Sequence, residues 1–189
     1  MNLTGKTVLF LGSSVTYGSA AGGISFADIA AEQCGFTCVK EAVSGTTLAD
    51  LDETSYVSRL KQVDTALRPD LFVCQLSTND AKDSLQIPIH EISDAIEAII
   101  RYVQKTWNCP IVFYTGTQYN NIKYLVMIDT LKLLQKSYDF AILDLWHDAD
   151  MICVDKADYN RYMQDPIHPR LAGYRDWWLP KFLDFFEKL

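Results

Sequence analysis

The feature of this chain that most constrains its fold is a regular alternation of short apolar runs with longer segments of helical periodicity. The apolar runs cover residues 7–11, 37–43, 71–76, 111–114 and 140–145. The helical segments cover residues 25–33, 56–67, 88–107, 122–138 and 171–189. Continuously apolar strands are buried on both faces, which is typical of a parallel sheet covered by helices. The pattern therefore predicts an α/β fold, a three-layer α/β/α arrangement with a five-stranded parallel sheet.

Local signals support the helical segments. Residues 88–107 carry isoleucine or valine at positions 92, 96, 99, 100 and 103, a spacing that marks one face of a helix. Ser25 is the expected N-cap of the helix at 25–33, and Gly35 its stop. A short helix is expected near residues 155–163. Pro180 is expected to kink the last helix.

Composition excludes several classes of protein. The chain has 189 residues and no repeat or linker, so we expect residues 1–189 to form a single domain. The net charge of −7 and the absence of a basic run make nucleic acid and anionic membranes poor partners. No stretch approaches ~18 uninterrupted apolar residues, so no membrane span is expected. The chain shows no signal peptide and no CxxC spacing, so we expect a cytoplasmic protein with reduced cysteines and no metal.

Polar and small residues follow the predicted strands. These segments cover residues 12–16, 44–47, 77–80, 115–119 and, before the last helix, 165–169. In an open parallel sheet, ligands bind outside the carboxyl ends of the strands, so these segments are expected to lie at one edge. Together they supply a hydroxyl, backbone-exposing small residues, an amide and an Asp/His pair. Each of the first three segments alone also fits an ordinary turn.

The pair Asp165 and His168 suggests nucleophilic catalysis. A serine nucleophile needs an imidazole to take its proton, and the imidazole needs a partner that fixes its tautomer. A carboxylate three residues before a histidine can reach its Nδ1, and the flanking prolines stiffen this segment. His147 follows the fifth strand among acidic residues and competes as the base. The spacing to Asp165 and the position before the last helix favour His168.

In these residues the chain resembles the SGNH/GDSL hydrolases, whose blocks are found in order over nearly the whole sequence. The nucleophile block resembles residues 12–16, which makes Ser14 the nucleophile. The second block matches at Gly45, whose backbone N–H would help to form an oxyanion hole with that of Ser14. The third block matches at Asn79, whose side chain would donate to the oxyanion. The last block, Asp-x-x-His, matches in full at Asp165 and His168.

The resemblance implies a flavodoxin-like sheet of order 2-1-3-4-5 and hydrolysis of a small-molecule carboxylic ester without metal or cofactor. Two positions depart from the family pattern: Ser13 stands where the family has Asp, and Ser77 where it has Gly. Without its Asp, the nucleophile turn lacks a carboxylate that helps to order it. A serine at 77 narrows the space beside Asn79.

The family analogy favours short acyl chains, such as acetyl groups on a carbohydrate, over a lipid. Four side chains are expected to line the pocket: Tyr17, Tyr114, Gln118 and Tyr119. Packing at a strand edge is the alternative for the tyrosines. Alternative enzymatic functions are those of a thioesterase or a lysophospholipase. A non-enzymatic alternative is a binding module in which the loop at 12–23 holds a phosphate of a flavin or nucleotide. An inactive member of the family is a third alternative.

Overall fold

The computed structural model describes residues 1–189 and has one five-stranded sheet at its centre. The strands are β1 (Thr7–Gly12), β2 (Thr37–Ala42), β3 (Leu71–Gln75), β4 (Ile111–Tyr114) and β5 (Ala141–Leu143). They pair in the order β2-β1-β3-β4-β5, and every pairing is parallel. The α/β fold and the strand order expected from the sequence are confirmed.

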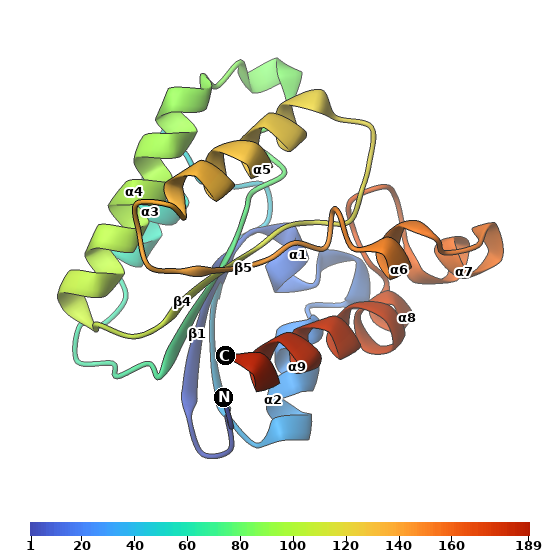
Figure 1. Ribbon diagram of the computed structural model, residues 1–189, viewed down its shortest axis with the longest axis horizontal. Helices are drawn as coiled ribbons and strands as arrows, with labels where there is room; N and C mark the ends of the chain where they lie inside the picture. Colours follow the sequence, from blue (N-terminus) through green and yellow to red (C-terminus); the bar gives the residue numbers. More distant parts are fainter.

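Helices cover both faces of the sheet (Figure 1). One layer holds α3 (Tyr56–Leu60), α4 (Ile89–Thr106) and α5 (Ile122–Leu134). The other holds α2 (Phe26–Cys34) and, at the end of the chain, α8 (Leu171–Gly173) and α9 (Leu179–Lys188). Shorter elements lie in the connections: α1 (Ser14–Tyr17), η1 (Ser19–Ala21), η2 (Asp83–Leu85), α6 (Ala149–Ile152) and α7 (Lys156–Tyr162).

The period of two along each strand divides the apolar side chains between two cores. In β1, Leu9 and Leu11 belong to the core beneath α3, α4 and α5. Val8 and Phe10, from the same strand, belong to the core beneath α2 and α9. Helices cover both faces of the sheet, and in an open parallel sheet ligands bind outside the carboxyl ends of the strands.

Two helices differ from the sequence expectation. The helix expected at 56–67 ends at Leu60, after which the chain continues in tighter turns with i,i+3 hydrogen bonds to Arg59 and Leu60. The last helix contains a π-helical stretch, Tyr174–Trp178, which ends two residues before Pro180. Proline has no N–H for the carbonyl one turn back and its ring crowds that carbonyl, so the wider turn lies where the kink was expected.

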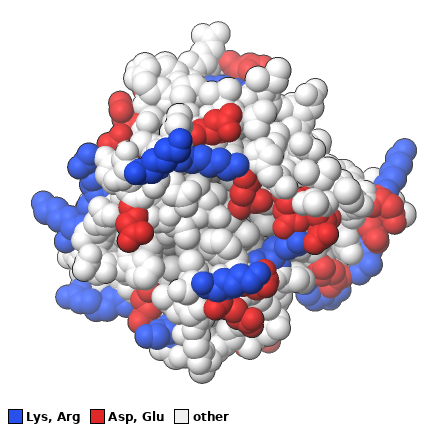
Figure 2. Space-filling view, in the orientation of Figure 1, with Lys and Arg blue, Asp and Glu red and all other residues white.

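The surface carries charges of both signs. Lysine and arginine side chains alternate with aspartate and glutamate over the face shown in Figure 2, without a continuous basic patch. No helix combines the length and the apolar character needed to cross a bilayer.

Candidate active site

Three hydrogen-bonded side chains lie at the carboxyl edge of the sheet. Ser14 is the first residue of α1, directly beyond β1, and is 7% exposed. Its Oγ lies 2.8 Å from Nε2 of His168. The other ring nitrogen of His168, Nδ1, lies 2.8 Å and 3.0 Å from the two carboxylate oxygens of Asp165. The segment before α8 thus meets the end of β1, although 154 residues separate Ser14 from His168.

The short turn from Asp165 to His168 holds the carboxylate under the imidazole. Oδ1 of Asp165 also accepts hydrogen bonds from the backbone N–H groups of Ile167 and His168. Burial acts to raise the pKa of Asp165, but these bonds and the imidazole outweigh it and hold the pKa below its ordinary value. Asp165 is therefore ionised at neutral pH, accepts from Nδ1–H, and leaves Nε2 as an acceptor for the Ser14 hydroxyl.

A buried amide orders the turn that carries Ser14. Oε1 of Gln75, the last residue of β3, accepts hydrogen bonds from the backbone N–H groups of Ser13 and Thr16 and from the Thr16 hydroxyl. Gly12 is required at the end of β1, because a Cβ there would lie 1.8 Å from Oγ1 of Thr16. Gln75 was not singled out from the sequence, where the only sign of it is one amide in an otherwise apolar strand.

The candidate oxyanion donors come from three segments. The backbone N–H of Ser14 is at the first position of a helix, where it has no intrahelical partner. Gly45 lies in an exposed turn with φ +85°, a conformation that favours glycine. One N–H of the Asn79 side-chain amide donates to the carbonyl of Thr46 at 2.9 Å, so the amide is tied to the turn that contains Gly45. Its second N–H remains available to a ligand.

The carboxylate of Asp80 stabilises the segment that follows the Gly45 turn. It is fully buried, and its two carboxylate oxygens accept hydrogen bonds of 2.8 Å from the backbone N–H groups of Leu48 and Ala49. Burial raises the pKa of Asp80 against the effect of these bonds. Asp80 therefore has a supporting role next to Asn79.

The two departures from the family pattern lie close to these groups. Oγ of Ser77 accepts a hydrogen bond from the backbone N–H of Asn79, so the serine adds a contact that a glycine would lack. Oγ of Ser13 is buried without a hydrogen-bond partner, as is the hydroxyl of Tyr56. The nucleophile turn is ordered through Gln75, without a carboxylate at position 13.

His147 forms a second Asp/His pair. Asp144 stands three residues before it and lies 2.8 Å from its Nδ1, so the expectation that spacing favours His168 was wrong. Asp144 also forms an ion pair with Lys132, and no hydrogen bond links His147 to Ser14. The two histidines have the same spacing from an aspartate, and they differ in that only His168 contacts the Ser14 hydroxyl.

None of the four residues expected to line the pocket lines the hollow that contains Asp165 and His168. Tyr17 is exposed, while Tyr114 is fully buried and its hydroxyl bonds to Thr16, so the expectation that Tyr114 lines the pocket was wrong. Its side chain belongs to the core beneath α9. Gln118 and Tyr119 line a separate hollow of about 400 Å³ beside Trp146.

A polar hollow lies directly beside the Asp/His pair. It measures about 420 Å³, and its lining contains one apolar residue. The lining residues are Ser19, Ala20, Gly22, Gln164, Asp165 and His168. This hollow was not expected from the sequence, because its two walls come from distant segments.

Comparison with known proteins gives one family and one fold. Residues 10–175 match the model of the GDSL-like Lipase/Acylhydrolase family. A Lactobacillus plantarum protein of solved structure is similar with a TM-score of 0.80 and 19% identity, over 98% of each chain. The inhibitor-bound aryl esterase of M. smegmatis has a TM-score of 0.71 and 16% identity, over 97% of this chain and 100% of that one. A carbohydrate acetylesterase family member from Sinorhizobium meliloti has a TM-score of 0.60 and 20% identity, over 74% and 82%. No curated protein matches the sequence.

Proposed function

The chain belongs to the GDSL-like lipase/acylhydrolase family, and we propose that it is a serine esterase that hydrolyses small carboxylic esters. The observation that carries the proposal is the continuous contact from Ser14 Oγ to Nε2 of His168 and from Nδ1 to Asp165. Ser14 is the nucleophile, His168 the general base and acid, and Asp165 the group that orients the imidazole.

The first half of the reaction forms an acyl-enzyme. Nε2 of His168 takes the hydroxyl proton as Oγ of Ser14 bonds to the ester carbonyl carbon, and the carbonyl electron pair moves to oxygen. The N–H groups of Ser14 and Gly45 and the amide of Asn79 donate to this oxyanion. A donor of this kind lowers the barrier by about 3–4 kcal/mol. When the carbonyl re-forms, the bond to the alkoxide breaks, and His168 gives it the proton.

The second half releases the acid. A water molecule attacks the acyl carbon as His168 takes one of its protons, and the same donors hold the second oxyanion. The bond between the acyl carbon and Ser14 Oγ then breaks, and the proton returns to Oγ. All proton transfers pass through His168, so the reaction needs no external acid or base.

We propose short acyl groups, such as acetyl on a carbohydrate or another small molecule, as the substrate class. The hollow beside His168 is lined mainly by polar residues, with a single apolar one, which favours a small polar ester over a lipid chain. Similar folds include an aryl esterase and a carbohydrate acetylesterase family member. That likeness is one of fold, so the substrate class depends chiefly on the chemistry of the hollow.

Hydrolysis rates on a graded panel test this proposal. The panel contains p-nitrophenyl esters from acetate to decanoate, acetylated monosaccharides, an acyl thioester and a lysophospholipid. We expect kcat/KM to be highest for acetate and to fall as the chain lengthens. Highest activity on decanoate or lysophospholipid would overturn the short-acyl substrate class, and no hydrolysis of any ester would overturn the esterase itself.

Replacing Asn79 by alanine is expected to lower kcat by about 10²–10³-fold with little change in KM, because its amide acts on charge that develops in the transition state. Steady-state kinetics with p-nitrophenyl acetate measures both constants. A change confined to KM would instead mean that Asn79 binds the ground-state ester.

A further inference from the structure

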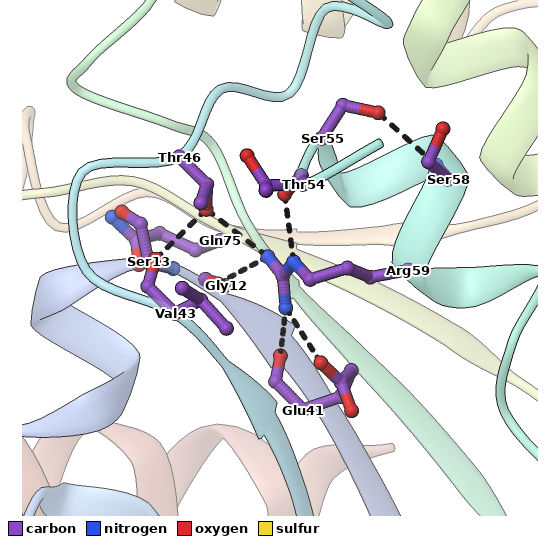
Figure 3. Close-up of polar contacts among 10 residues, drawn as sticks. All are labelled: Gly12, Ser13, Glu41, Val43, Thr46, Thr54, Ser55, Ser58, Arg59 and Gln75. Carbon is purple, nitrogen blue, oxygen red and sulfur yellow. Dashed lines mark hydrogen bonds and ion pairs between the residues drawn. The ribbon is translucent and has the colours of Figure 1, made fainter. Parts of the chain in front are cut away.

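Arg59 is a buried cation behind the segments that carry the candidate oxyanion donors. It lies in α3 and is 7% exposed. Figure 3 shows its guanidinium group at the centre of a cluster formed by the ends of β1 and β2 and the loop that connects β2 to α3. Its only carboxylate partner is Glu41, at 2.9 Å, which is partly exposed. A buried charge is costly unless its hydrogen bonds are satisfied, so the partners of Arg59 indicate what it holds in place.

The guanidinium group uses its donors on three separate segments. Nη2 donates to the carbonyl of Gly12 at 2.8 Å and to Oγ1 of Thr46 at 3.2 Å. Nη1 donates to the carbonyl and to Oε1 of Glu41. Nε donates to the carbonyl of Thr54 at 2.9 Å. A planar fork of five N–H groups can make this set of contacts, whereas the single ammonium group of lysine cannot span it.

The contacts with Gly12 and Thr46 connect Arg59 to the segments that carry Ser14 and the candidate oxyanion donors. Gly12 precedes the turn of the nucleophile, and its carbonyl also accepts from the N–H of Val43, at the start of the turn that contains Gly45. Thr46 follows Gly45, its hydroxyl donates to Val43, and its carbonyl accepts from the Asn79 amide. Thr46 therefore contacts Arg59 through its side chain and Asn79 through its backbone.

We propose that Arg59 is a positioning residue for the oxyanion hole: through Thr46 and Gly12 it fixes the Gly45 turn and the Asn79 amide relative to the turn of Ser14. This inference rests on the proposed esterase function and adds to it a residue that does not touch the substrate. Arg59 acts through its contacts with the turns and takes no part in proton transfer. Loss of Arg59 should therefore raise the free energy of the transition state, which the oxyanion donors stabilise.

The test compares Arg59→Lys and Thr46→Val with Ser58→Ala. Arg59→Lys keeps the charge but loses the fork, and Thr46→Val removes the hydroxyl that links Arg59 to the turn. Ser58 is the matched control, because it also lies in α3 but its hydroxyl bonds to Asp50 instead. All rates are measured well below each variant's Tm and are normalised to folded enzyme.

We expect Arg59→Lys to lower kcat for p-nitrophenyl acetate by about 10²-fold, since a small misplacement of catalytic groups has an effect of that size. KM should change less than kcat, and affinity for a boronic acid that forms a tetrahedral adduct on serine should fall in parallel with kcat. Thr46→Val should show the same pattern with a smaller factor, and Ser58→Ala should match the parent. If kcat and boronate affinity in Thr46→Val equal those of the parent, the proposal is overturned. This holds whether or not the Arg59→Lys protein folds.

A second readout does not depend on activity. Amide NMR spectra of the same variants report the environments of the Gly45 N–H and the Asn79 side-chain amide. We expect both signals to shift in Thr46→Val and Arg59→Lys and to stay in place in Ser58→Ala. If the parent hydrolyses no ester, the proposed function fails, and unshifted Gly45 and Asn79 signals would overturn the positioning role separately.

Discussion

Ser14→Ala is expected to lower kcat/KM for p-nitrophenyl acetate by about 10⁵–10⁶-fold, because the change removes the proposed nucleophile. Its stability should be close to that of the parent. The hydroxyl makes one side-chain hydrogen bond, to His168, and alanine is well suited to the first turn of a helix. Steady-state kinetics and thermal unfolding measure the two effects.

The combination of lost activity and retained Tm separates chemistry from folding. A Ser14→Ala protein that keeps more than a small fraction of the parent rate would show that another group attacks the ester. A large fall in Tm would show that Ser14 has a structural role not evident from its contacts.

His168→Ala is expected to be nearly as inactive as Ser14→Ala, because a nucleophile and its base act as one unit. Combining the two changes should therefore cost little more than either alone. Asp165→Ala should keep somewhat more activity, since the imidazole can still accept a proton when it is less well oriented. Comparison of kcat for the three single variants and the double variant checks this order.

His147→Ala is the matched control for His168→Ala. Both histidines have an aspartate three residues earlier and a 2.8 Å contact with it, but only His168 contacts Ser14. His147→Ala should stay within a few-fold of the parent. An inactive His147→Ala together with an active His168→Ala would make the assignment of the base wrong.

Most of the fold could be predicted, because the apolar runs report burial on both faces of a sheet directly. The early end of the helix at Leu60 could not be predicted, nor could the contacts that Arg59 makes from it. The backbone carbonyls of Glu41 and Gly12 that Arg59 contacts are brought together by the tertiary fold alone. No local propensity encodes such a contact.

The resemblance to the family's blocks predicted that Ser14 and His168 meet at one edge of the sheet, and the structure brings the two side chains into contact. The supporting side chains Gln75 and Arg59 were missed. Gln75 is a single polar residue in an apolar strand, whereas Arg59 lies in a segment of mixed polarity. In neither case does the sequence show which atoms the side chain faces.

Tyr114 was expected to line the pocket, but it lies in the core. A tyrosine at the end of a strand suggests a pocket wall, but the strand's period of two turns its side chain into the core beneath α9. The equal spacing of Asp144 and Asp165 from their histidines likewise leaves the base undecided without the three-dimensional structure.

Labelling with a fluorophosphonate probe tests the central claim, an activated serine at position 14, most directly. The probe phosphonylates a serine that is activated by a base, and it requires no knowledge of the natural ester. Intact-mass measurement and peptide mapping should find one adduct per parent chain, on Ser14, and none on Ser14→Ala. An unlabelled parent chain, or an adduct that persists in Ser14→Ala, would contradict the account.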